Sequence, residues 1–214
     1  MQGLRAFLSK VREANLSLRP SKSSVGFTDL TFLGHTVGQH GASPSEHLVD
    51  KILQAPAPKT KKQLRSFLRL VGFYRAYVPN SAAIAVPLTD LTKKGLPNVL
   101  QWSDVHERAF STLKRCVCNP PVLQLPDVTK PFILQMMLHV MVYEQESEQT
   151  KHPVAFASRK LLPREQNYSI IEREALAIVC GVKKYHNYLY GQHFYLETDH
   201  HPLQFLNEAS LAVE

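Results

Sequence analysis

The sequence lacks the features of a membrane or secreted protein. No uninterrupted apolar run approaches the roughly 18 residues of a membrane span, and the start lacks the long apolar stretch of a signal peptide. Its three cysteines are an odd and sparse set, which is typical of a reducing compartment. We therefore expect an intracellular protein, cytoplasmic or nuclear, with no membrane partner.

Acidic residues are scarce in the front part of the chain. Residues 1–130 hold 18 Lys and Arg against 8 Asp and Glu, a net of +10, whereas residues 131–214 hold 7 against 10, a net of −3. With 44% hydrophobic residues, the 214-residue chain is not wholly disordered and is long enough for one large or two small cores. The asymmetry predicts two units, of which the basic one is suited to bind a polyanion.

Helix-start signals recur along the chain. A serine, a proline and a glutamate at 43–46 predict a helix with Ser43 as its N-cap. Capping boxes at 60–63 and 169–172 open two more helices, which are expected to end near 78–80 and near Leu189. Apolar spacing predicts further helices over 4–18, after Ser103 and from His201, and strands within 24–38, 132–134, 154–156 and 194–199.

Recognisable blocks of residues follow one another in order through the chain. They include Leu18-Arg19-Pro20-Ser21-Lys22, Phe32-Leu33-Gly34-His35, Gly72-Phe73-Tyr74-Arg75, Lys130-Pro131-Phe132-Ile133-Leu134-Gln135, His152-Pro153-Val154-Ala155-Phe156-Ala157-Ser158-Arg159, Glu172-Arg173-Glu174-Ala175-Leu176-Ala177 and Thr198-Asp199-His200. With these blocks the chain resembles, over nearly its whole length, the polymerase polyprotein of Ty3/gypsy-type LTR retrotransposons.

The resemblance implies an α+β fold, with a helical reverse transcriptase thumb and connection segment before an incomplete RNase H-like domain with a mixed sheet. It assigns residues 1–38 to the end of the palm, 39–80 to the thumb, 81–128 to the connection and 129–214 to the RNase H-like domain. The family's fingers, most of its palm and its metal-binding Asp-Asp motif are absent from this sequence. We therefore expect a truncated, degenerate copy that does not synthesise DNA by itself.

The family's second activity hydrolyses the RNA strand of an RNA–DNA hybrid with two Mg²⁺ ions, which need a cluster of carboxylate ligands. The resemblance places Glu174 at the family's helix glutamate and Asp199 at its strand-end aspartate, both as catalytic and metal-binding positions. From the residues alone, Glu174 also fits a solvated helix face, and Asp199 also fits the N-cap of a helix that starts near His201. The family's first aspartate is replaced at Met137, and its fourth falls beyond the last residue.

Our hypothesis for the replacement at Met137 is a change of reading frame just after Gln135, restored before Lys151. If the family-like run Gln-Thr-Asp-Ala-Ser-Cys-Asp-Gly-Val is encoded by CAG ACT GAT GCT TCA TGT GAT GGT GTA, deletion of the C of ACT gives Gln-Met-Met-Leu-His-Val-Met-Val and the start of a Tyr codon. That run is the sequence of residues 135–143, where 140–143 has the composition of a strand. We expect no measurable RNase H activity, because two of four carboxylates do not build a two-metal site.

The helix that opens at 60–63 has a basic side. Its residues Lys61, Lys62, Arg65 and Arg69, with Lys51 and Lys59 nearby, are candidate phosphate ligands for a nucleic acid duplex or RNA–DNA hybrid. The alternative is an ordinary solvated face. Cys116, Cys118 and His106 are zinc-type ligands, but their spacing is wrong for a zinc knuckle and favours packing residues.

Three functions remain open at this point. The first is an inactive remnant of a retrotransposon reverse transcriptase and RNase H. The second is a non-enzymatic nucleic-acid-binding module that uses the basic thumb. The third is that the chain is a piece of a longer, intact polyprotein.

Overall fold

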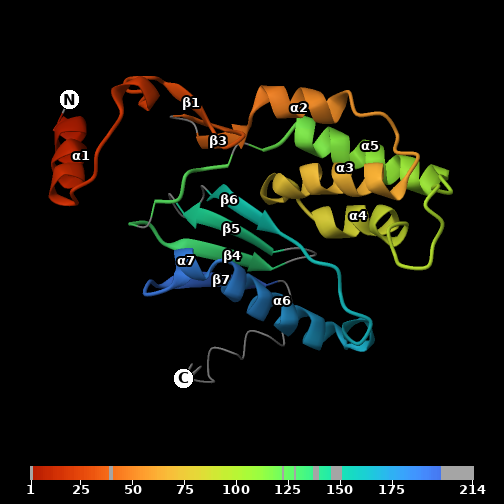
Figure 1. Cartoon of the computed structure of the whole chain (residues 1–214). Coiled ribbons are helices and arrows are strands. Elements are labelled where there is room, and N and C mark those ends of the chain that lie inside the picture. Colours follow the sequence, from red (N-terminus) through yellow and green to blue (C-terminus); the bar gives the residue numbers. More distant parts are fainter. Residues whose placement is uncertain are drawn as a thin grey trace.

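The structure is a computed structural model that describes residues 2–38, 41–121, 123–127, 129–136, 140–145 and 151–198 (Figure 1). Within these residues it has seven α-helices, three short 3-10 helices and two sheets. No described helix is both long and apolar enough to cross a membrane. The mixed α/β composition confirms the expected fold class.

The chain starts with a helix and an antiparallel sheet. Helix α1 (Gln2–Glu13) and the 3-10 helix η1 (Pro20–Lys22) lead into the sheet β1-β2-β3, formed by β1 (Asp29–Phe32), β2 (His35–Gly38) and β3 (Gly41–Pro44). The turn between β1 and β2 needs glycine at Gly34, where φ is +83° and an added Cβ would lie 3.0 Å from Leu48 Cδ1. The absence of a side chain at Gly34 lets the turn lie against Leu48, in the first helix of the next unit.

Residues 46–118 form a helical unit around one core. It consists of α2 (Glu46–Leu53), α3 (Lys61–Phe73), the 3-10 helix η2 (Arg75–Tyr77), α4 (Ser81–Asp90) and α5 (Asp104–Cys118). The capping box at the start of α3 is present, since Thr60 accepts a hydrogen bond from the Gln63 amide. The apolar faces of these helices meet in a core that includes Ile52, Leu64, Phe67, Leu88, Phe110 and Leu113.

The C-terminal part of the chain folds into a four-stranded mixed sheet of order β6-β5-β4-β7, and its own two helices, α6 and α7, lie on one face of this sheet (Figure 1). Its elements are β4 (Phe132–Met136), β5 (Val140–Gln145), β6 (Lys151–Ala157), the 3-10 helix η3 (Glu165–Asn167), α6 (Ile170–Lys184), α7 (His186–Leu189) and β7 (Phe194–Thr198). Strands β4 and β7 are parallel, and the other two pairs are antiparallel.

The two faces of this sheet bury different side chains. Phe132, Leu134 and Met136 form a core with α6 and α7 on one face. On the opposite face Met141 and Phe156 join the core of the helical unit. The sheet is therefore packed between α6 and the helical unit, as alternation along the strands requires.

The helix and strand predictions are mostly confirmed, with corrections at the ends. The helix expected from Ser43 starts with Ser45 as its N-cap, because Ser43 and Pro44 pair with β2. The first helix ends at Glu13 rather than 18, α3 ends at Phe73 ahead of a 3-10 turn, and the long helix from the box at 169–172 breaks at Tyr185. The helix expected from His201 lies outside the described residues.

Candidate functional site

The parallel strands β4 and β7 end side by side. Their register runs from Phe132 opposite Phe194 to Met136 opposite Thr198. The next residues along the sequence are Met137 and Asp199, for which the resemblance predicts two of the metal-ligand positions, and both lie outside the described residues. The register of the described strands thus brings the last residues before these two predicted positions side by side.

Glu174 is on α6, on the side of the helix that packs on the sheet. It lies one turn before Ala177 and Ile178, which pack on the core beneath the helix, and its Oε2 atom is buried. Tyr188, beyond the end of α6, stacks on Phe132 at the start of β4, with ring centroids 5.9 Å apart. Helix α6 continues for ten residues after Glu174, to Lys184, which corresponds to about 15 Å, so Glu174 lies toward the end of β4 that is far from Tyr188.

The described carboxylate nearest that edge on β7 is Glu197, and it has protein partners. Its Oε1 lies 2.5 Å from Lys151 Nζ, and its Oε2 accepts a hydrogen bond of 3.3 Å from Gln135 Nε2. Burial is the main reason that the pKa of nearby Tyr143 is raised, and the charge of Glu197 adds to this effect. Glu197 is therefore an ion-pair residue of the sheet face.

The described residues hold no carboxylate cluster of the kind that a pair of Mg²⁺ ions needs, and the predicted positions Met137 and Asp199 lie outside them. Two such ions need several carboxylates on one small surface. Among the described residues no group of three His, Cys, Asp or Glu side chains could hold a metal ion. In the sequence, the position that follows β4 carries the thioether of Met137, which binds hard cations poorly.

The zinc-type residues also lie apart. His106 Nδ1 is 2.8 Å from Ser103 Oγ at the start of α5, whereas Cys116 and Cys118 are near its other end. Ten residues of helix separate His106 from Cys116, which corresponds to about 15 Å. These residues cap or pack α5 and do not form a site.

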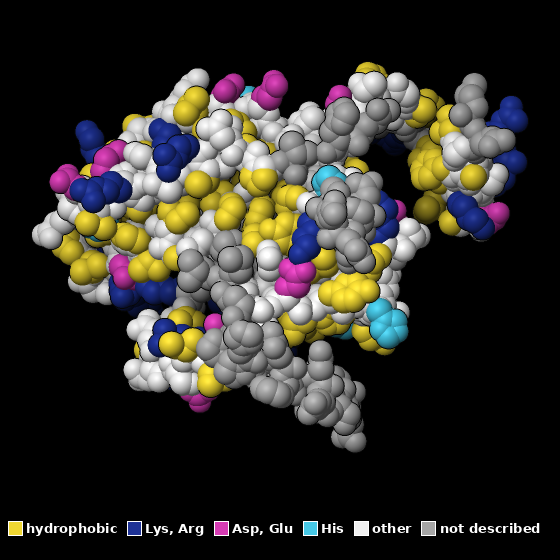
Figure 2. Space-filling model, turned by 180° about the vertical axis from the view of Figure 1, so that it is seen from behind, with side chains coloured by type: hydrophobic (Ala, Val, Ile, Leu, Met, Phe, Trp, Pro, Cys, Tyr) yellow, Lys and Arg dark blue, Asp and Glu magenta, His cyan; other side chains and the backbone are white. Residues whose placement is uncertain are grey.

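The basic residues of the helical unit divide into two groups. Lys51, Lys59, Lys62 and Arg69 are exposed. Lys61 is only 9% exposed, and its Nζ donates to the carbonyl oxygens of Lys93 at 2.7 Å and of Leu96 at 2.6 Å. Arg65 is exposed and its Nη2 donates to the Thr92 carbonyl oxygen at 3.0 Å. Figure 2 shows Lys and Arg side chains spread over the helical end of the molecule.

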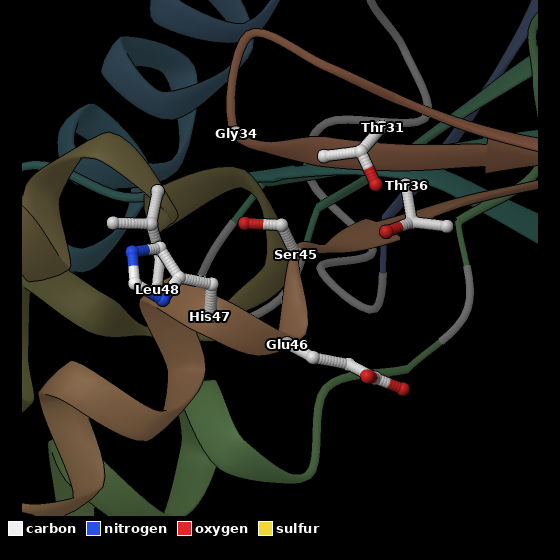
Figure 3. A pocket seen from close by; sticks show the side chains of 7 residues that line it. All are labelled: Thr31, Gly34, Thr36, Ser45, Glu46, His47 and Leu48. Carbon is white, nitrogen blue, oxygen red and sulfur yellow. The ribbon is translucent and has the colours of Figure 1, made fainter.

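The β1–β2 turn is held by an aromatic cluster that the sequence analysis missed. His35 stacks on Phe73 and Tyr77, with ring centroids 5.1 and 5.6 Å apart, and Tyr74 donates a hydrogen bond of 2.7 Å to the Gly34 carbonyl oxygen. An open groove of about 630 Å³ lies beside this turn (Figure 3). It is lined by Thr31, Gly34, Thr36, Ser45, Glu46, His47 and Leu48. The sequence block Phe32-Leu33-Gly34-His35 marked this turn as a family feature. It did not indicate which aromatic residues contact His35.

The chain thus consists of a helical unit followed by a mixed sheet that carries α6 on one face. Residues 102–196 match the family model described as the RNase H-like domain found in reverse transcriptase. The match begins just before α5, ends within β7 and includes Glu174, so the RNase H-like assignment is supported by sequence as well as by fold.

The chain is similar to Pol polyproteins of transposons. It is 37% identical over 207 residues to the retrovirus-related Pol polyprotein from transposon 297 and 34% identical over 212 residues to that from transposon 412, both of Drosophila melanogaster. These matches cover 97% and 96% of this chain but 20% and 17% of the relatives. The Tf2-3 polyprotein of Schizosaccharomyces pombe is 29% identical over 203 residues, 92% of this chain and 15% of that relative. The chain thus spans about a fifth of the length of these relatives.

Solved structures agree on the fold. A foamy viral protease-reverse transcriptase in complex with double-stranded DNA superposes with a TM-score of 0.80 at 23% identity, over 97% of this chain and 37% of that one. The foamy viral enzyme in complex with an RNA/DNA hybrid gives 0.76 at 24% identity, over 89% and 26%. The chain is homologous to the Pol polyproteins of Ty3/gypsy-type retrotransposons, in the region that carries the RNase H-like domain of their reverse transcriptase.

Proposed function

We propose that this chain, a retrotransposon reverse transcriptase and RNase H-like segment, binds a nucleic acid duplex through its helical unit and does not hydrolyse it. The observation that carries the proposal is the strand edge where β4 and β7 end together, because the sequence supplies methionine there instead of the family's aspartate. The fold can thus present a duplex-binding surface while the donor set for Mg²⁺ is incomplete.

The net charge supports the binding part of the proposal. Residues 1–130 carry a net of +10, and the exposed Lys51, Lys59, Lys62 and Arg69 are free to reach phosphates. Lys61 and Arg65 contribute less, because their donors already bind carbonyl oxygens within the protein. Foamy viral proteins of the same fold were solved in complex with double-stranded DNA and with an RNA/DNA hybrid, which favours a duplex as the ligand.

We propose that residues 1–38 act as the palm edge, 39–80 as the thumb, 81–128 as the connection and 129–214 as the RNase H-like domain. When bound in the family's complete site, Mg²⁺ ions activate the water that cleaves RNA. Here Glu174 and Asp199 remain as two of the positions for that site, and no step of hydrolysis is assigned to them.

Binding and cleavage are tested on the same protein. Anisotropy of a labelled duplex, titrated at several salt concentrations, is expected to give an affinity that falls linearly in log–log form with salt. Lys62→Gln and Arg69→Gln are each expected to reduce the slope by about 0.9 if the side chain neutralises one phosphate. Lys183→Gln, an exposed lysine of α6, is the matched control with unchanged slope. Equal slopes in all variants would mean that Lys62 and Arg69 do not contact phosphates, and would contradict the proposed role of the thumb surface.

Cleavage is measured on an RNA–DNA hybrid with Mg²⁺ or Mn²⁺. No RNA product above background is expected, in the wild type or in Glu174→Gln. Cleavage by the wild type that Glu174→Gln abolishes would show a working metal site and would overturn this part of the proposal.

A longer protein is the second candidate, because the chain spans about a fifth of its transposon relatives. In that case RNA-directed DNA synthesis and hybrid hydrolysis are proposed for the longer polyprotein and not for these 214 residues alone. The nucleotide sequence on either side of the coding region decides between the two, since an open frame upstream that encodes the polymerase Asp-Asp motif supports the longer protein.

A further inference from the structure

Three consecutive residues after β6 contact both units of the protein. The chain leaves β6 beneath α4 and then descends to α6 (Figure 1). Along this stretch Ser158 and Lys160 contact α4, and Arg159 between them contacts the α6 side. Successive side chains of this segment thus contact opposite sides.

Ser158 caps α4 from a distance in the sequence. Its Oγ accepts a hydrogen bond of 2.8 Å from the Ala82 amide and lies 3.0 Å from Ser81 Oγ. The residue at the N-cap position of α4, Asn80, has φ of +53° and makes no side-chain capping bond. The start of α4 thus depends on a hydroxyl from the RNase H-like unit for a bond that a local N-cap usually supplies.

Lys160 contacts the other end of the same helix. Its Nζ pairs with Asp90, the last residue of α4, and this pairing is the main reason that the pKa of Asp90 is lowered. Lys93 Nζ lies 3.3 Å from the same carboxylate, but that contact stays within the helical unit. Ser158 and Lys160 therefore bind α4 at both of its ends.

Arg159 binds in the opposite direction. Its Nη2 donates to Oε1 of Glu165 at 2.9 Å, and its Nε donates to Cys180 Sγ on α6 at 3.2 Å. The Glu165 side chain is 7% exposed, and its Oε2 also accepts from the Leu162 amide at 2.8 Å. A buried carboxylate with fixed partners makes this side of the segment rigid.

We propose that residues 158–160 are a bracket that sets the orientation of the RNase H-like sheet and α6 relative to the helical unit. The apolar contact made by Met141 and Phe156 holds the two units together but has little directional preference. Hydrogen bonds and a paired carboxylate have defined geometry, so the bracket fixes the angle about that contact. Ser158 and Lys160 are positioning residues, since they act on the placement of α6 and of Glu174.

Residual dipolar couplings of the full chain measure this orientation directly, without nucleic acid. In the wild type the amides of α2 to α5 and those of β4 to β7 are expected to fit one alignment tensor. In Ser158→Ala/Lys160→Ala the two sets are expected to need separate tensors, while each keeps folded chemical shifts. Lys93→Ala is the matched control, because it removes a contact to the same Asp90 within one unit, and it is expected to keep one tensor.

The conservative pair Ser158→Thr/Lys160→Arg retains a hydroxyl and a cation and is expected to restore one tensor. A single tensor in the double alanine variant would overturn the proposal. If that variant does not fold, amide exchange in Ser158→Ala replaces it: exchange of the Ala82 amide is expected to be about tenfold faster than in the wild type. An unchanged Ala82 rate would overturn the proposal as well. Because neither measurement uses a duplex, their outcome is independent of the proposed function.

Discussion

Tyr77 Oη lies 3.0 Å from Nδ1 of His35, and the two rings stack with their planes 26° apart. This pair connects the β1–β2 turn to the segment that follows α3. Burial lowers the pKa of His35 below its usual 6.5, because the charged imidazolium would lose water on this site. The hydroxyls of Tyr74 and Tyr77, whose pKa values are raised by burial, stay neutral near that pH.

His35 is expected to make the stability of the protein depend on pH. Its folded-state pKa is depressed, so its contribution is complete above about pH 6.5. As the pH falls below that value, the unfolded chain takes up the proton first and the contribution is lost down to the folded pKa. Urea unfolding at about pH 8 and about pH 5 should therefore show a larger loss of stability for the wild type than for His35→Gln.

The same comparison contains its own control. Every other ionisable side chain is the same in both proteins, so only the difference between them reports His35. An equal loss of stability in the wild type and in His35→Gln would contradict the assignment.

Lys61 and Lys62 are adjacent in sequence and are expected to behave in opposite ways. Lys61→Met leaves the carbonyl oxygens of Lys93 and Leu96 without their buried donor, which should cost about 1–3 kcal/mol of unfolding free energy. Lys62→Met, on the exposed side, should change that free energy by no more than about 0.5 kcal/mol. Chemical denaturation measures both, and equal losses would contradict the assigned roles.

In duplex binding, the variant at position 62 is expected to have the larger effect, which is the opposite of the order expected for stability. Lys62→Met is expected to reduce the salt dependence of binding, and Lys61→Met to leave it unchanged as long as the protein is folded. Binding that responds equally to both changes would mean that Lys61 leaves its carbonyl partners in the complex.

The sequence predicted the parts of the fold that depend on neighbouring residues. Both capping boxes, at 60–63 and 169–172, are present because the residues that satisfy the helix start are within one turn of it. The break at Tyr185 was missed, since its cause is packing of that ring in the core beneath α6. A local sequence pattern does not indicate such tertiary contacts.

The candidate site was predictable to the extent that it follows the family's residue order. Glu174 was assigned from the Ala175-Leu176-Ala177 that follows it and stays a prediction as a site position, whereas the burial of Lys61 depends on carbonyl groups 32 and 35 residues away. The cap that Ser158 provides to α4 spans 76 residues, which is why no sequence motif indicated it. Asp199 and Met137 remain predictions as site positions.

Met141 carries the largest expected change in stability. It is 7% exposed, belongs to the core of the helical unit and accepts a hydrogen bond of 3.2 Å from Tyr143 Oη. Met141→Asp would bury a carboxylate there, with an expected cost of about 3 kcal/mol or more. Met141→Leu keeps the volume and should cost less than about 1.5 kcal/mol. Unfolding followed by fluorescence of Trp102, which packs on the same core, measures both, and a mild effect of aspartate would mean that Met141 is solvated.

Residues 136–143 are expected to be a frameshifted run, and the described side chains at 136, 141 and 142 pack as residues of buried strands do. Met136, Met141 and Val142 are 3%, 7% and 0% exposed, and β5 pairs with β4 from Val140 to Glu144. In the family-like frame the same three positions would be Thr, Asp and Gly, so the shift replaced polar and small residues by apolar ones that favour a buried strand.

Sequencing the genomic DNA or transcript tests this origin. Restoring one nucleotide just after the Gln135 codon is expected to recover Thr-Asp-Ala-Ser at 136–139, with aspartate in place of Met137. A second, compensating shift is expected before the Lys151 codon, because the family-like sequence resumes at His152-Pro153-Val154. If neither alternative frame encodes Thr-Asp-Ala-Ser there, the methionine arose by another route.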